Sequence, residues 1–320
     1  MKSYQRLLIF VMLVLALTAL ISPWAATAWD LISGARTAAP EDRIPFSRFF
    51  DRFFMVSGIL LFFSCRSLLK IESLSQLGLA PRTRALPDIA IGLCLALGSM
   101  FVLGFIMSAA GVYEAFFRLS LGESVEQYLK AILTGLTVGF LEEIFFRGII
   151  FRGLLEDWKP LPAFVTANLF YSALHFVKPA EKYFLSGLDP WAGFRHLFST
   201  FAPFLEPAEI APGIIGLLLI GIVLSFAFLR TGTLYLSIGL HAGWVISIKT
   251  VRVFGDYQTE NLGWLFGSTE PKIVSGVVTW AGILLVGLAV HWITRNRSGL
   301  CVPNETVKVT VPTRSGRRLA

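Results

Sequence analysis

The sequence predicts an all-α fold, a polytopic bundle of about eight transmembrane helices. Of its 320 residues, 55% are hydrophobic and only 15% are charged, and the mean hydropathy is +0.68. Soluble domains are about 25% charged. The apolar residues form runs long enough to cross a bilayer, and short segments with proline, glycine and basic residues separate these runs. Together these observations predict a membrane protein.

The predicted spans are residues 7–29, 50–69, 89–110, 130–151, 161–178, 213–229, 231–249 and 273–294. The second run is the weakest, because its charge-free core extends only from Phe53 to Cys65, about 20 Å of helix. Arg66 must then extend its side chain toward the headgroups. Without this run the bundle has seven helices, which is the fallback.

Prolines mark both ends of the fifth run, since Pro160 and Pro162 suit a helix start and Pro179 ends the helix. The connection 179–211 is the longest inside the apolar body and is rich in aromatic residues. It predicts a short helix at the membrane interface. We expect His196 in this connection to be solvated and His291, at the end of the last run, to be interfacial.

The chain divides into residues 1–127 with the N-terminal transmembrane helices, 128–250 with a motif-bearing core, 251–298 with the last transmembrane helix, and a disordered basic tail at 299–320. The first run is longer than the apolar part of a signal peptide. An uncleaved transmembrane helix is therefore favoured, although Ala26-Thr27-Ala28 resembles a cleavage site.

The net charge of +7 does not indicate nucleic-acid binding, because the basic residues are scattered beside the apolar runs. Three cysteines without a CxxC spacing argue against a disulfide framework or cysteine-bound zinc. The Lys and Arg count over eight alternating helices favours a cytoplasmic N-terminus, mainly through the basic tail. Short loops without a large soluble domain are typical of a bacterial inner-membrane protein.

Glu142, Glu143 and Arg147 lie inside the fourth run. Each such group costs roughly 2.5–3.5 kcal/mol near the centre of an inserted helix, so a functional role is the first expectation. Glu143 and Arg147 have the i, i+4 spacing of an ion pair on one helix face. Glu142 points about 100° away and suits a general base acting on water. The alternative is that all three charges form one packing network.

Two histidines lie in later runs, His175 four residues after Tyr171, and His241 between Gly239 and Gly243. The GxxxG spacing of these glycines allows close helix approach, and we expect His241 to reach a group on the helix that packs there. The alternative for each histidine is a hydrogen bond at a helix contact. Because His175 lies nearer the membrane surface than Glu142, a shared site is expected to be a pit open to one face.

Carboxylate and imidazole are ligands of a water-activating metal such as zinc. The same groups activate water without a metal when glutamate is the base and histidine relays a proton or stabilises an oxyanion. The HExxH spacing of soluble zinc proteases is absent, so three separate helices must build the site.

The three motifs resemble those of the CPBP intramembrane proteases, a group that includes type II CAAX prenyl endopeptidases and bacterial bacteriocin-processing and immunity homologues. The group has EExxxR on one transmembrane helix, aromatic-xxx-His on the next, and His-xxx-small/Asn on a later one. Here the first motif is complete, the second has Tyr171 where Phe is usual, and the third has Val245 where many members carry Asn. The resemblance covers about residues 128–250.

The resemblance implies an intramembrane (metallo)endopeptidase that hydrolyses a peptide bond of a membrane-associated protein or peptide. Glu142 would activate water, with His175 and His241 as metal ligands or as proton and oxyanion partners. Glu143 and Arg147 would support the site. Glu142, His175 and His241 would hold Zn²⁺ or another divalent metal, unless the mechanism uses glutamate alone. The expected partners are membrane lipid and a peptide or protein substrate.

Two alternatives stay open at the level of sequence. One is a non-catalytic immunity or scaffold protein of the same fold, which Val245 supports best. The other is a transporter that uses the buried charges as a proton or ion path. The absence of an inverted repeat in the sequence argues mildly against a transporter.

Overall fold

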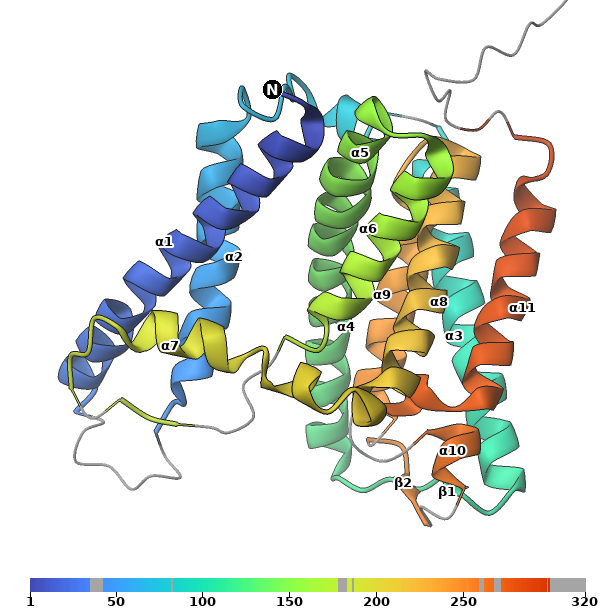
Figure 1. Cartoon of the computed structure of the whole chain (residues 1–320). Coiled ribbons are helices and arrows are strands. Elements are labelled where there is room, and N and C mark those ends of the chain that lie inside the picture. Colours follow the sequence, from blue (N-terminus) through green and yellow to red (C-terminus); the bar gives the residue numbers. More distant parts are fainter. Residues whose placement is uncertain are drawn as a thin grey trace, which may run out of the picture.

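The structure is a computed structural model that describes residues 1–34, 43–81, 83–177, 183–185, 187–251, 253–258, 262–267, 272–297 and 299. The predicted disordered tail lies outside these residues except for position 299. The described part is a bundle of helices (Figure 1), as the sequence predicted. A two-residue antiparallel ladder, β1 (Tyr113–Glu114) with β2 (Asp256–Tyr257), was not predicted.

Each predicted apolar run falls on a long helix. In chain order these helices are α1 (Ser3–Ile32), α2 (Phe46–Cys65), α3 (Ala85–Ala109), α4 (Leu121–Glu143), α6 (Pro160–Leu174), α8 (Pro207–Thr231), α9 (Tyr235–Thr250) and α11 (Val277–Thr294). The fourth run continues beyond α4 as a π-helix, η4 (Ile144–Phe151), and then as α5 (Arg152–Asp157). Shorter pieces are η3 (Leu74–Leu77), α7 (Ala192–Ser199), η5 (Ala202–Leu205), α10 (Gly263–Phe266) and η6 (Lys272–Ser275).

Four helices in the described ranges, α1, α3, α8 and α11, are long and apolar enough to cross a membrane. They make this chain a membrane protein. Helices α6 and α9 have only 15 and 16 residues, about 22–24 Å of helix at 1.5 Å per residue. A count of eight crossing helices therefore stays a prediction for α2, α4, α6 and α9.

Helix α9 lies between α3 and α4, and small residues bring all three helices close together. A Cβ added at Gly239 would lie 2.2 Å from the carbonyl oxygen of Ile89 on α3. On the other side, a Cβ at Gly139 of α4 would lie 2.8 Å from the backbone nitrogen of Ala242. The predicted role of the Gly239/Gly243 pair was thus wrong in one respect: it packs against α3, whereas His241 reaches α4.

Helices α1, α2 and α7 form a second group beside the main bundle (Figure 1). Helix α7 is the short helix predicted in the connection 179–211. Phe198 on this helix and Trp191 just before it are exposed, and the location of the helix at the membrane interface stays a prediction. The expectation that His196 is solvated was wrong. Its side chain is 1% exposed and packs between Phe46 and Phe50, with ring centroids 5.2 and 4.7 Å away.

Candidate active site

The site begins with a row of small residues on α4. Gly135, Gly139 and Glu143 are spaced four residues apart, so they lie on one face of the helix. The two glycines receive the backbone of α9 at Ala242. Because His241 precedes Ala242, this contact brings its ring to the end of α4. The Nδ1 atom of His241 lies 2.8 Å from Oε1 of the fully buried Glu143.

Arg147 follows on the π-helix η4, and its side chain is only 1% exposed. Its guanidinium donates to Oε1 of Glu143 at 2.8 Å, which is the ion pair that the i, i+4 spacing predicted. It also donates to the carbonyl oxygen of Gly221 at 3.2 Å. The guanidinium carbon lies 4.5 Å from the ring centre of Tyr171, a cation–π contact. These contacts make a buried arginine tolerable and hold Glu143 in place.

Asn168 is a buried polar residue of this region that the motif analysis missed. Its Nδ2 donates to the carbonyl oxygen of Phe164 at 2.8 Å, and its Oδ1 accepts from the Ser225 hydroxyl at 2.9 Å. The Arg147 Nε in turn donates to the same hydroxyl at 3.4 Å. A polar residue inside an apolar run is itself a signal that sequence analysis can use. Asn168 therefore positions Ser225, whose hydroxyl contacts Arg147.

Glu142 faces two imidazoles at once. Its Oε2 lies 3.8 Å from Nε2 of His175 and 3.7 Å from Nε2 of His241. Both separations exceed a direct hydrogen bond, which ends near 3.2 Å. Among the described residues, this buried Oε2 atom has no hydrogen-bond partner. Buried polar atoms of this kind are usually satisfied by water or an ion.

The hydrogen bonds at Nδ1 of His175 and His241 determine whether the Nε2 atom of each ring donates or accepts. The Nδ1 atom of His175 lies 2.8 Å from the carbonyl oxygen of Tyr171, and a carbonyl oxygen only accepts, so Nδ1 must donate. The Nδ1 atom of His241 likewise donates to the Glu143 carboxylate. In the neutral rings, both Nε2 atoms then present a lone pair toward Glu142. Three acceptors that face one point need a water molecule or a cation between them.

Exposure increases from one side of the site to the other. The side chains of Glu143 and His241 are 0% and 5% exposed, whereas those of His175 and Glu142 are 29% and 33% exposed. His175 directly follows the last residue of α6, where the helix ends. This gradient fits a pit that opens beside His175 and is closed behind Glu143.

A divalent metal is the cofactor that the family resemblance implies. The donor set fits it chemically, since one carboxylate with an orphaned oxygen faces two imidazole lone pairs. However, within the described ranges no three His, Cys, Asp or Glu side chains are arranged to hold a metal ion. The chemistry proposed below therefore uses only groups of the chain itself.

The comparison with known families agrees with these features. Residues 124–247 match the family model described as "Type II CAAX prenyl endopeptidase Rce1-like". No curated protein and no solved structure gave a match to the chain. The matched segment contains all five residues of the site, from Glu142 on α4 to His241 on α9. Residues 124–247 of this membrane protein thus match an Rce1-like domain, and this match supports the resemblance to the CAAX-type proteases.

Proposed function

We propose that this protein is an intramembrane endopeptidase that hydrolyses a peptide bond of a membrane-associated protein or peptide. One observation carries the proposal: the orphaned Oε2 atom of Glu142 lies within 4 Å of two imidazole Nε2 atoms. A water molecule at this point would contact a base and be oriented by two fixed rings. Carboxylate-assisted attack by water is the chemistry that such a site performs.

Hydrolysis would proceed in two steps. In the first step, Glu142 takes a proton from the water, and the water oxygen attacks the carbonyl carbon of the scissile bond. The electron pair of the C=O bond moves onto oxygen and forms a tetrahedral oxyanion. In the second step, the protonated Glu142 gives its proton to the amide nitrogen, the C–N bond breaks, and a carboxylic acid and an amine leave.

The two histidines have different roles in this scheme because their Nδ1 partners differ. His175 is anchored to a backbone carbonyl and orients the water through Nε2. His241 donates through Nδ1 to the buried Glu143 carboxylate, which holds the ring in one orientation. Its Nε2 faces Glu142, and this ring would be the proton or oxyanion partner of the reaction.

Glu143 and Arg147 are positioning residues here, because they act through His241 and do not face the proposed water. If a divalent metal binds, Glu142, His175 and His241 would hold it, and it would supply a more acidic bound water. The steps above predict that purified protein keeps its activity after dialysis against a chelator. Loss of activity that Zn²⁺ restores would instead assign these three side chains to a metal.

The substrate is proposed only by class. The family name refers to endopeptidases that act on prenylated proteins. The most exposed side chains of the site, His175 and Glu142, lie near the end of α6, so a peptide bond that enters from one membrane face would reach them first. We therefore propose a substrate whose scissile bond lies close to its membrane anchor.

The test compares membrane proteins from cells that carry the wild type, Glu142→Gln or Glu126→Gln. Glu126 is a matched control, because it is an exposed carboxylate on the same helix that pairs only with the exposed Lys130. We expect an uncleaved precursor to accumulate with Glu142→Gln but not with Glu126→Gln, at equal protein levels. Normal processing by a folded Glu142→Gln variant would contradict the proposal and favour a non-catalytic immunity or scaffold role.

A further inference from the structure

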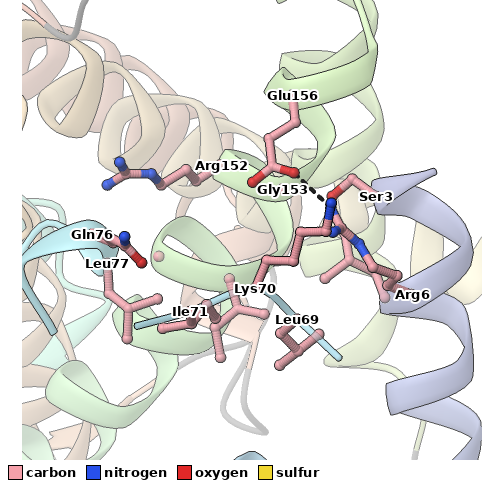
Figure 2. Close-up of a pocket in the computed structure, with 13 residues that line it drawn as sticks. Ser3, Arg6, Leu69, Lys70, Ile71, Gln76, Leu77, Arg152, Gly153 and Glu156 are labelled. Atoms are coloured by element: carbon pink, nitrogen blue, oxygen red, sulfur yellow. Dashed lines mark hydrogen bonds and ion pairs between the residues drawn. The ribbon is translucent and has the colours of Figure 1, made fainter. Parts of the chain in front are cut away.

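A polar cavity lies at the end of the bundle where the chain begins. Its volume is about 190 Å³, equivalent to roughly six water molecules. The first turns of α1, the segment 69–77 and the junction of η4 with α5 form its walls (Figure 2). None of the five site residues lines it, although Gly148 lies in the cavity wall next to Arg147.

The cavity is electropositive. Arg6, Lys70 and Arg152 line it, and Glu156 is the single acidic side chain among the lining residues. This leaves a formal excess of two positive charges in a concave space. Gln76 and Ser3 add polar groups that can donate hydrogen bonds. Figure 2 shows the polar side chains around the cavity, with leucine and isoleucine side chains below them.

Arg6 supplies the observation that points to a ligand. Its residue is only 6% exposed, and one terminal nitrogen pairs with Glu156 at 2.7 Å. The Nε and the other terminal nitrogen are buried and have no hydrogen-bond partner in the described part of the chain. A buried guanidinium with orphaned donors is costly, and an anion with several acceptor oxygens would satisfy them.

Two contacts between the start of α1 and the end of α5 hold Arg6 at the cavity. The backbone nitrogen of Ser3 donates to the side chain of Asp157, which ties the start of α1 to the end of α5. The Arg6–Glu156 ion pair lies one turn further along the same contact. Both contacts hold α1 against α5 at the cavity.

We propose that this cavity binds the phosphate group of an anionic ligand, either a phospholipid headgroup or a soluble phosphate ester. Phosphate oxygens would accept hydrogen bonds from the unpartnered guanidinium nitrogens of Arg6, and the negative charge of phosphate would offset the excess positive charge in the cavity. The Lys and Arg count favours a cytoplasmic N-terminus, and on that side anionic lipids would attract a basic pocket. The inference does not depend on peptide hydrolysis.

The experiment measures lipid binding by the purified full-length protein with native mass spectrometry. Phosphatidylglycerol is the anionic probe, phosphatidylcholine is the zwitterionic reference, and inorganic phosphate is the soluble probe. The test variant is Lys70→Gln/Arg152→Gln, which spares the buried Arg6. The matched control is Arg66→Gln/Lys159→Gln, which removes the same charge from exposed positions that do not line the cavity.

We expect the test variant to bind the anionic probe about tenfold more weakly than the wild type, because it removes two of the three cationic groups that line the cavity. The control should keep wild-type binding. A loss confined to phosphatidylglycerol assigns the cavity to a lipid headgroup, and a loss confined to inorganic phosphate assigns it to a soluble ligand. Unchanged binding in the test variant, or equal loss in the control, would overturn the proposal.

Discussion

Replacing Gly139 with alanine tests how the site is assembled. The added Cβ would lie 2.8 Å from the nitrogen of Ala242 and 3.1 Å from its Cα and Cβ atoms. Comfortable contacts between such atoms begin near 3.5 Å, so α4 and α9 must move apart by about 0.5 Å. Two of these atoms belong to the backbone and the third is the Cβ attached to it, so none of them can rotate away. Overpacking of this kind costs about 1–3 kcal/mol, more than the gain of up to 1 kcal/mol from glycine to alanine in a helix.

The same shift would lengthen the contact between Glu143 and His241. Glu143 lies one helical turn after Gly139 on α4, and His241 directly precedes Ala242 on α9. Their 2.8 Å hydrogen bond would exceed 3.2 Å, the usual upper limit. A 1 Å misplacement in an active site can cost about 100-fold in rate, so about a tenfold loss is expected here. The assays are thermal unfolding in detergent and the cleavage rate of the precursor that accumulates with Glu142→Gln.

Gly104→Ala on α3 is the control, because a Cβ at this mid-helix position meets no described atom within 4 Å. It should leave the cleavage rate unchanged and raise the unfolding temperature slightly. If Gly139→Ala stabilises the protein as Gly104→Ala does and cleaves at the wild-type rate, the close packing of α4 on α9 is refuted.

Three further predictions address the supports of the site and the α1–α2–α7 group. Arg147→Met should destabilise the protein by about 3–5 kcal/mol, because it removes the cation that pairs with the buried Glu143 carboxylate and leaves it only the hydrogen bond from His241; adding Glu143→Gln should restore much of the unfolding temperature but not cleavage. Tyr171→Phe keeps the ring face under Arg147 and should therefore destabilise the protein less than Tyr171→Leu, which should lose about 1–2 kcal/mol of cation–π energy in thermal unfolding. Burial lowers the pKa of His196 to about 4, so as the pH falls the unfolded chain binds a proton before the folded protein does. The contribution of His196 to the free energy of unfolding is therefore full above about pH 6.5 and is lost as the pH falls toward 4, by at most about 1.4 kcal/mol per pH unit. His196→Phe should flatten this pH dependence of the unfolding temperature, and an unchanged slope would contradict the buried neutral ring.

The helices and the order of the motifs were predictable because they depend on local sequence. An apolar run of sufficient length forms a helix in a membrane wherever it packs. The ion pair between Glu143 and Arg147 followed from their spacing alone, and the structure has it at 2.8 Å even though a π-helix begins between them. The family resemblance came from three short motifs, and the family match over 124–247 confirmed it.

The predictions that failed were those that required knowing which helix packs against a given helix face. Gly239 and Gly243 predicted a close helix contact but could not reveal that the partner is α3. The glycines that place Glu143 beside His241 are Gly135 and Gly139 on α4, which have the same GxxxG spacing, a signal that the motif analysis did not use. Spacing along one helix does not identify the neighbour, because tertiary packing selects the partner.

His196 shows the same limit in a connecting segment. A histidine among prolines, glycines and charges has the composition of a solvated loop. It is buried because Gly193, one turn before it, lets α7 lie against α1, where a Cβ at position 193 would meet the Ala19 carbonyl. Asn168 was missed for a different reason, since it belongs to no motif and its role depends on Ser225 of a distant helix.

The central claim is that Glu142, His175 and His241 surround one solvent site. An experimental high-resolution density map of the full chain in lipid tests it most directly. We predict one discrete solvent or ion peak in contact with the carboxylate of Glu142 and with both imidazole Nε2 atoms. Side chains that point into lipid, or that lie too far apart for a single bound species to bridge, would contradict the account.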